Sequence, residues 1–256
     1  MTVAAVVPAA GSGSRLGADV PKAFVPLAGV PVVVRAVDGL LGSGAVDEVL
    51  VAVPAALLDH ARDLFAGRPV RVLVGGADRT ASVRLALDVL CADRPVGTAA
   101  GHAAHGGERP GRPGGDGPPE IVLVHDAARP LTPPALIAAV VAAVRAGHPA
   151  VVPALALADT VKRVARSASS GVGADTVERT VDRSELRAAQ TPQGFAFETL
   201  RRAYEKSGAD GIATDDAGLV ERLGEPVVTV PGDPAAFKVT TPWDLRIAEL
   251  LLAEAS

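Results

Sequence analysis

Short apolar runs alternate with amphipathic stretches along the first third of the chain. Each run is rich in β-branched residues and is bounded by Gly or Pro, which is typical of a buried strand. Strands are predicted at 3–7, 46–53 and 70–74, and helices at 31–41, 54–65 and 82–90. A strand–helix alternation indicates an α/β fold with a mostly parallel sheet and helices on both faces.

The same alternation returns in the second half of the chain. Strands are predicted at 120–124, 150–153 and 226–230, and helices at 132–145, 195–206 and 214–223. Thr241, Pro242 and Asp244 form a start signal for a last helix. We therefore predict one domain over residues 1–256.

Two segments interrupt this pattern. Residues 92–119 are dominated by Gly and Pro and keep no apolar period, which predicts a flexible insertion. Residues 159–189 hold two β-like runs, 160–164 and 176–181, around a Ser/Gly-rich turn, so a hairpin arm is expected. Because an isolated hairpin is marginally stable, we expect a second subunit to support it in a homodimer.

Composition excludes several partners. The net charge of -4 and the pI near 5.7 provide no basic surface for nucleic acid, and no apolar run is long enough for a membrane span. The single cysteine, Cys91, rules out an internal disulfide. A cytoplasmic protein that binds neither nucleic acid nor membrane is the expectation.

The first strand leads directly into a glycine-rich turn, residues 8–17, with two nearby cations, Arg15 and Lys22. Turn amides and a following helix N-terminus bind phosphate well, and Gly lets a ligand approach the backbone. A dinucleotide-binding loop is excluded because Leu16 stands where the G-x-G-x-x-G pattern needs Gly. A phosphate-binding loop is therefore favoured over an ordinary strand-to-helix turn.

The strand at 120–124 ends in HDAARP, residues 125–130. Asp126 is a candidate metal ligand at the strand end, and Arg129 is a candidate phosphate-binding cation. The alternative is a capped turn in which Asp126 and Arg129 pair with each other. Lys238 lies between Phe237 and Val239, and a cation in such an apolar run needs an anionic partner.

Seven motifs in order resemble one family. They are PAAGSGSRLGADVPKAF, GGADRTASV, VHDAARP, DTVKR, TVDRSEL, TPQGF and FKVTTPWDL. Together they resemble the 2-C-methyl-D-erythritol 4-phosphate cytidylyltransferases of non-mevalonate isoprenoid biosynthesis. The resemblance implies a Rossmann-like nucleotidyltransferase fold, dimerisation through a β-arm, and Mg²⁺ as cofactor. It also implies that CTP and methylerythritol phosphate react to give CDP-methylerythritol and pyrophosphate.

The resemblance further implies roles for individual residues. Arg15 and Lys22 would stabilise the transition state at the triphosphate, and Arg183 and Lys238 would hold the attacking phosphate, with Arg183 supplied by the other subunit. Asp126 would bind Mg²⁺. The nucleotide-binding set would be Ala9, Ala10, Gly11, Gly13, Gly75, Gly76, Ser82, Asp126 and Ala127. The substrate-binding set would be Arg129, Thr160, Arg183, Thr191, Thr214, Lys238 and Thr240.

Some alternatives remain open from the residues alone. Arg183 could simply pair with Glu185 or Asp182 on an exposed arm. A cytidylyltransferase for ribitol 5-phosphate would share the fold, the arm and the CTP chemistry. The third possibility is a nucleotide-binding protein without catalytic activity. Such a protein would have no chemical need for all of Arg15, Lys22, Asp126, Arg183 and Lys238, so their presence argues against it.

Overall fold

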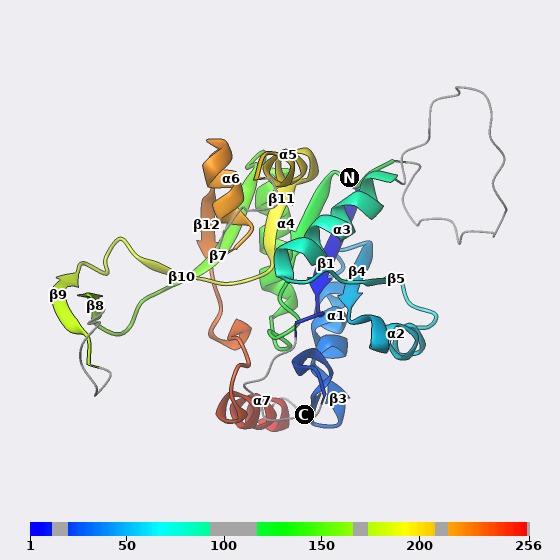
Figure 1. The fold of residues 1–256 in the computed structure, drawn as a ribbon, viewed down its shortest axis with the longest axis horizontal. Helices are drawn as coiled ribbons and strands as arrows, with labels where there is room; N and C mark the ends of the chain where they lie inside the picture. Colours follow the sequence, from blue (N-terminus) through cyan, green and yellow to red (C-terminus); the bar gives the residue numbers. More distant parts are fainter. Residues whose placement is uncertain (12–19, 93–116, 166–173, 208–214, 255–256) are drawn as a thin grey trace.

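The computed structural model describes residues 1–11, 20–92, 117–165, 174–207 and 215–254 (Figure 1). The strands are β1 Val3–Pro8, β2 Pro26–Leu27, β3 Val30–Pro31, β4 Glu48–Val53, β5 Val70–Val74, β6 Ile121–Val124, β7 Ala150–Ala156, β8 Val161–Ala165, β9 Thr176–Val181, β10 Arg187–Ala189, β11 Gln193–Ala196 and β12 Val228–Pro231. The helices are α1 Val32–Gly42, α2 Leu58–Leu64, α3 Arg79–Ala92, α4 Pro134–Arg145, α5 Phe197–Ser207, α6 Ala217–Leu223 and α7 Pro242–Glu254. Short 3₁₀ helices are η2 Lys22–Phe24, η3 Ala55–Leu57 and η4 Pro234–Ala236.

A mixed, mostly parallel sheet forms the centre of the molecule. Its strand order is β10-β7-β11-β6-β1-β4-β5, and β12 pairs in parallel with β7. The block β5-β4-β1-β6 is parallel, whereas β10 and β11 run antiparallel to their neighbours. The chain moves from β1 outward to β4 and β5 and then returns to the other side of β1 with β6. Such a reversal leaves a crevice beyond the carboxyl ends of β1 and β6, where α/β sheets bind ligands.

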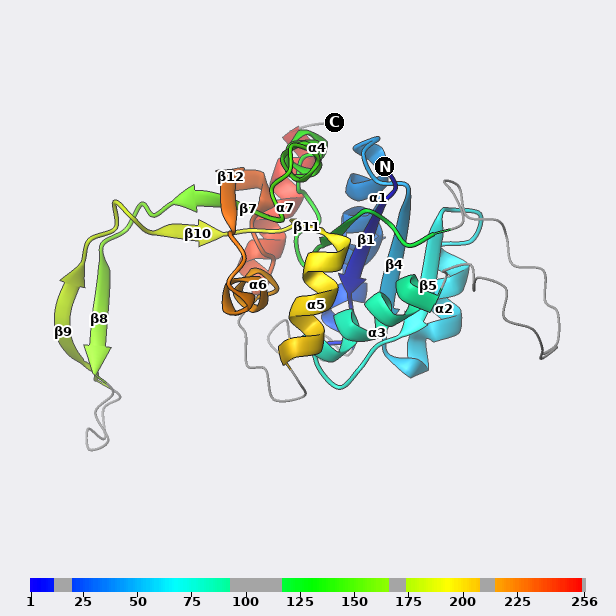
Figure 2. The same cartoon turned by 90° about the horizontal axis from the view of Figure 1, so that it is seen from above.

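Both faces of the sheet are covered by helices, as the sequence pattern predicts. Alternate residues of β1 enter opposite cores, because successive strand side chains point to opposite faces. Val3 and Val7 pack with α1, α2 and α4, and Val6 packs with α3, α5 and α6. Figure 2 shows the two helical layers on either side of the sheet. The central strands are therefore apolar throughout their length.

Most predicted helices and strands agree with the structure, and the largest difference lies at the start of one helix. The helix predicted at 195–206 is wrong at its start, because Gln193–Ala196 form β11 and α5 begins only at Phe197. Phe195 is fully buried between β6 and β7, so tertiary pairing overrides the helical pattern. The insertion predicted at 92–119 falls mostly outside the described residues.

The hairpin arm is present as β8 and β9, which pair with each other and project away from the main sheet (Figures 1 and 2). Val164 and Val177 on the arm are exposed. The arm is shorter than predicted at its C-terminal end, because Arg187–Ala189 join the main sheet as β10.

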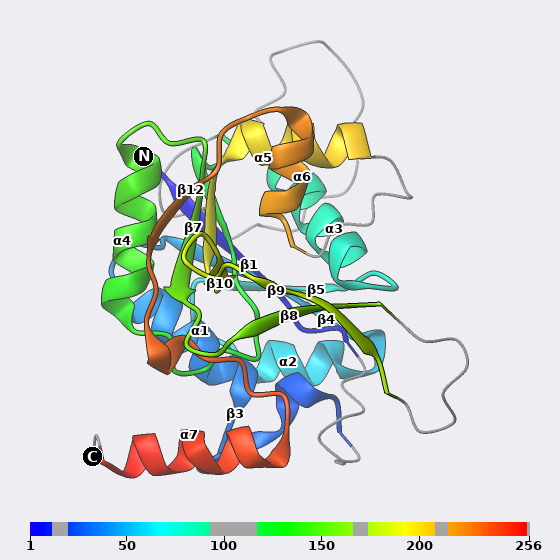
Figure 3. The same cartoon turned by 90° about the vertical axis from the view of Figure 1, so that its left-hand side faces the viewer.

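The last helix, α7, packs away from the main sheet against β2 and β3, as Figures 1 and 3 both show. A small core of Leu27, Val32, Val239 and Ala248 joins them. The start signal read from the sequence is correct: the Thr241 hydroxyl accepts from the Asp244 N–H, and the Asp244 carboxylate accepts from the Thr241 N–H.

Candidate active site

Residues 8–11, at the end of β1 and just after it, meet the glycine turn that follows β5. A Cβ added to Gly75 would lie 2.5 Å from the Ala10 Cβ, and one added to Gly76 would lie 2.5 Å from the Ala81 Cβ. Only Gly therefore permits this close approach. The Ser82 hydroxyl accepts from the Gly76 N–H at 3.0 Å and fixes the second turn.

Asp126, at the end of β6, is the centre of a charged cluster. Its carboxylate lies 2.8 Å from Lys238 Nζ, 3.2 Å from Arg79 Nε and 3.8 Å from Arg129 Nε. The Asp126 side chain is only 12 % exposed. Burial would raise the pKa of this carboxyl, but Arg79 and Lys238 outweigh it and hold the pKa well below its usual range. Asp126 is therefore ionised at neutral pH.

Arg79, at the start of α3, pairs with a second carboxylate. Its Nη2 donates to Asp216 Oδ2 at 2.6 Å, and the Asp216 side chain is 1 % exposed. Burial would lower the pKa of the Arg79 guanidinium, but Asp216 and Asp126 outweigh this and raise it. Arg79 thus links Asp126, at the crevice, to Asp216, just before α6.

Lys238 reaches Asp126 because its neighbours fix the backbone. The Val239 N–H donates to the Ala128 carbonyl at 2.8 Å, and the Val239 side chain is fully buried. The Lys238 side chain, on the other hand, is 45 % exposed. Asp126 is the anionic partner that the sequence predicts for Lys238. Residues 237–240 form no regular strand.

Thr191 holds the backbone at Asp126 in place. Its hydroxyl oxygen accepts from the Asp126 N–H at 3.0 Å and lies 3.0 Å from His125 Nδ1. His125 is completely buried, and burial lowers its pKa to about 4, so the ring is neutral. Thr191 and His125 therefore hold the end of β6 in place.

Two pockets adjoin the charged cluster. The first, about 190 Å³, is bounded by the β1 turn, Lys22 and Ser82. The second, about 270 Å³, is bounded by Arg129, Thr191, Gln193 and Asp215 among others. Both pockets are lined by the same three charged side chains, Arg79, Asp126 and Lys238. Two ligands bound in these pockets would meet at those three groups.

A search against protein families matches residues 3–99 and 114–254 to the family described as 2-C-methyl-D-erythritol 4-phosphate cytidylyltransferase. The chain belongs to this family. Relatives bearing the family name include one from Rhodococcus opacus, 53% identical over 98% of this chain and 96% of its own length. Another, from Nocardia farcinica, is 53% identical over 98% of this chain and 94% of its own length.

Solved structures of family members share the fold. The 2-C-methyl-D-erythritol 4-phosphate cytidylyltransferase from Thermus thermophilus superposes with a TM-score of 0.70 at 33% identity, covering 99% of this chain and 100% of that one. The 4-diphosphocytidyl-2C-methyl-D-erythritol synthase from Anaerococcus prevotii gives 0.75 at 24% identity, covering 98% of both chains. The predicted nucleotidyltransferase-like α/β fold is thus confirmed.

Most residues that the family resemblance implicates come together in the structure. The first pocket is lined by predicted site residues Ala9, Ala10, Gly11, Lys22, Ser82, Asp126, Ala127 and Lys238. Gly75 and Gly76 flank it through their contacts with Ala10 and Ser82. Arg129 and Thr191 line the second pocket. Gly13, Arg15 and Thr214 lie outside the described residues.

Three predicted residues stand apart from both pockets within this chain. Thr160 and Arg183 are exposed on the arm. The Thr240 hydroxyl donates to Asp244 Oδ2 at 2.7 Å, so it is engaged at the start of α7. Arg129 also has a structural role, since its Nη1 donates to the Ala236 carbonyl at 2.6 Å and ties the Lys238 segment to β6.

Sequence reasoning missed Arg79, although it lines both pockets. One signal was available: a cation in the first turn of a helix opposes the helix dipole and indicates a specific anionic partner. Its partners Asp126 and Asp216 are distant in sequence, so the pairing itself was not deducible.

The donor set at Asp126 fits Mg²⁺ only together with a substrate. Among the described residues, no cluster of three or more His, Cys, Asp or Glu side chains could hold a metal. Asp126 nonetheless offers an ionised carboxylate at the wall of both pockets. Mg²⁺ in nucleotide enzymes is commonly held by one or two carboxylates plus phosphate oxygens and water, which this arrangement allows.

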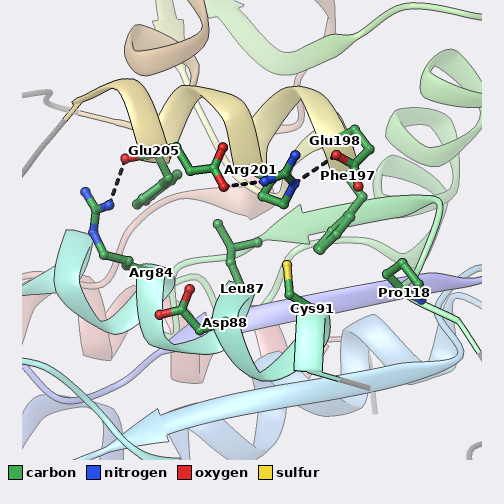
Figure 4. Close-up of a pocket in the computed structure, with 10 residues that line it drawn as sticks. Arg84, Leu87, Asp88, Cys91, Pro118, Phe197, Glu198, Arg201 and Glu205 are labelled. Carbon is green, nitrogen blue, oxygen red and sulfur yellow. Dashed lines mark hydrogen bonds and ion pairs between the residues drawn. The ribbon is translucent and has the colours of Figure 1, made fainter. Parts of the chain in front are cut away.

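A further pocket, about 320 Å³, lies between α3 and α5, away from this cluster (Figure 4). None of the predicted site residues lines it. Within its wall, Arg201 pairs with Glu198 and Glu205. In the part of the chain that the structure describes, no helix is long and apolar enough to cross a membrane.

Proposed function

We propose that this protein transfers the cytidylyl group of CTP to 2-C-methyl-D-erythritol 4-phosphate, giving 4-CDP-2-C-methyl-D-erythritol and pyrophosphate. The relatives that match the whole chain carry the name of this activity. The observation that supports it best is the pair of pockets that share Arg79, Asp126 and Lys238. A reaction between two phosphorylated molecules needs this arrangement.

CTP binds in the first pocket, against the β1 turn and Ser82, and the polyol phosphate binds in the second pocket. A phosphate oxygen of the polyol attacks the α-phosphorus of CTP, and pyrophosphate leaves. Lys22 and Lys238, on the walls of the first pocket, neutralise charge that develops on the phosphate oxygens. The chain supplies alignment and charge, and no protein nucleophile is needed.

Mg²⁺ is the proposed cofactor, and Asp126 is the residue that would hold it. When bound, the metal would neutralise phosphate charge. Asp126 also fixes Lys238 through the 2.8 Å ion pair, so the same carboxylate positions a catalytic cation.

The arm completes the site in a homodimer. Support comes from the isolated β8–β9 pair, from its exposed Val164 and Val177, and from the exposure of Arg183 beyond β9. Arg183 of the partner subunit would bind the attacking phosphate. A cytoplasmic location accords with the single cysteine, Cys91, whose thiol is free.

Pyrophosphate release tests the activity directly. Each of the four nucleoside triphosphates is paired with 2-C-methyl-D-erythritol 4-phosphate and, separately, with ribitol 5-phosphate, in the presence of Mg²⁺. We expect turnover with CTP and methylerythritol phosphate alone. Turnover with ribitol 5-phosphate would instead identify a polyol cytidylyltransferase of different specificity. CTP binding without turnover on either acceptor would indicate an idle nucleotide-binding protein.

A further inference from the structure

A buried hydrogen-bond chain leads from α5 to the charged cluster. The Tyr204 hydroxyl donates to Asp216 Oδ1 at 2.5 Å, Asp216 Oδ2 accepts from Arg79 Nη2 at 2.6 Å, and Arg79 Nε donates to Asp126 Oδ1 at 3.2 Å. Tyr204 is 3 % exposed and lines neither substrate pocket. Its hydroxyl can therefore act on the chemistry only through Asp216 and Arg79.

The Tyr204 ring is itself fixed. Arg84 of α3 donates from Nη1 to the Tyr204 carbonyl at 2.7 Å, and its guanidinium carbon lies 5.4 Å from the ring centroid. Arg84 lies on the wall of the α3–α5 pocket (Figure 4). The guanidinium over the ring and the burial of the ring restrict its rotation, so packing sets the direction of the donated hydrogen bond.

Asp216 has one carboxylate oxygen for each partner. With the hydroxyl on Oδ1, the other oxygen faces Arg79. Without the hydroxyl, Oδ1 would be a buried acceptor with no hydrogen-bond donor among the described residues. An unsatisfied buried carboxylate oxygen is costly, so the carboxylate would tend to rotate. Such a rotation would draw the Arg79 guanidinium away from Asp126. The Asp126 carboxylate, which pairs with both Arg79 and Lys238, would then lose one of these two partners.

We infer that Tyr204 is a positioning residue for the transfer reaction: by orienting Asp216, it fixes Arg79 and thereby the Asp126 carboxylate between the two pockets. Buried ionic networks contribute little net stability compared with apolar packing, so orientation is the better explanation for this one. The inference builds on the proposed function.

Tyr204→Phe removes the hydroxyl and keeps the ring. We expect kcat/KM for CTP to fall about tenfold, in line with the loss of a hydrogen bond to a charged group. Thr199→Val is the matched control because it removes another buried hydroxyl from α5. Turnover is compared at a temperature at which circular dichroism shows both variants fully folded, and there only Tyr204→Phe should lose turnover. Equal loss in both variants, or none in Tyr204→Phe, overturns the inference.

A double-mutant cycle separates positioning from packing. If Tyr204 acts through Asp216, then Tyr204→Phe combined with Asp216→Asn should lose no more turnover than Asp216→Asn alone. Additive losses would contradict the proposed coupling of Tyr204 to Asp216.

If the wild-type protein turns over neither acceptor, the proposed function fails by itself. Calorimetry of CTP binding in the presence of Mg²⁺ then still tests the hydrogen-bond chain from Tyr204 to Asp126. There, Tyr204→Phe should weaken binding relative to Thr199→Val, because Asp126 and Arg79 line the nucleotide pocket, and equal affinities would overturn the inference.

Discussion

Lys22 and Lys238 line the first pocket, and Lys238 reaches the Asp126 carboxylate while nearly half of its side chain stays accessible. Preorganised cations of this kind stabilise the charge of the transition state more than that of the ground state. Lys22→Ala and Lys238→Ala should each lower kcat by about 10²-fold or more. Pyrophosphate release with CTP and methylerythritol phosphate is the measurement.

Lys206 provides the matched control for the two lysines. It lies exposed on α5, so Lys206→Ala removes the same charge without touching either pocket. It should keep wild-type turnover. Near-normal kcat in Lys22→Ala or Lys238→Ala would refute the role of that residue.

Single residues were predictable where the local sequence forces a conclusion. Lys238, set between apolar neighbours, required an anion, and the structure supplies Asp126. Thr191 was expected on the substrate side, and it does line the second pocket, but its hydroxyl also supports the Asp126 backbone. Asp216 was not singled out because an Asp beside a helix start reads as a cap, whereas its real partners are Arg79 and Tyr204.

At the scale of elements, the two glycine turns depend on each other. Gly75→Ala would place a Cβ 2.5 Å from the Ala10 Cβ and 2.9 Å from Ser82 Oγ. One turn must then shift, and misplacement of bound CTP should lower kcat/KM for CTP about tenfold or more. Steady-state kinetics with varied CTP measures this. Gly42→Ala at the end of α1, where a Cβ meets open space, should leave kcat/KM unchanged. An unaffected Gly75→Ala would show that the turn does not hold CTP.

The start of α7 gives a stability prediction with a pH signature. Burial would raise the pKa of Asp244, but hydrogen bonds from Thr240 and Thr241 outweigh it and lower the pKa below its usual value. A lowered folded-state pKa adds stability above the ordinary value of 3.8, and the gain is lost as pH falls through the folded-state pKa. Asp244→Ala should therefore cost about 1 kcal/mol at pH 7, the usual worth of a helix cap.

Urea unfolding at one fixed protein concentration measures the effect of Asp244→Ala. The difference from wild type should shrink as pH falls from 3.8 through the lowered folded-state pKa, below which both proteins lack the charged carboxylate. A difference that is constant across pH would show that the carboxylate is not the cap.

Elements were predictable where periodicity and burial agree. The parallel strands β1, β4 and β5 consist of apolar residues apart from Glu48 and Arg71, and the sequence predicts them well. β11 was missed because Phe195 and Ala196 continue the apolar pattern of α5, and only the antiparallel pairing with β6 and β7 makes them a strand. Such pairing joins residues far apart in the chain, so no local pattern contains it.

At the scale of the whole molecule, the strand order brings the site together. The β1 turn, the end of β6 and the Lys238 segment are distant in sequence, and the reversal at β1 places them around one crevice. Arg183, like Thr160, is exposed on the arm and lines neither pocket. A site completed by the partner subunit accounts for that placement, and mixed dimers can test it.

Arg183→Ala and Lys22→Ala should each be nearly inactive as pure dimers. In a mixed dimer, one site would combine Lys22 from the Arg183→Ala subunit with Arg183 from the Lys22→Ala subunit, and would be intact. Random exchange makes half of the dimers mixed, so an equal mixture should recover about one quarter of wild-type activity. The activity is measured after unfolding and refolding the two variants together, and separately refolded variants mixed just before assay serve as control. If Arg183 serves the site of its own subunit, mixing restores nothing, because every site then lacks one of the two cations.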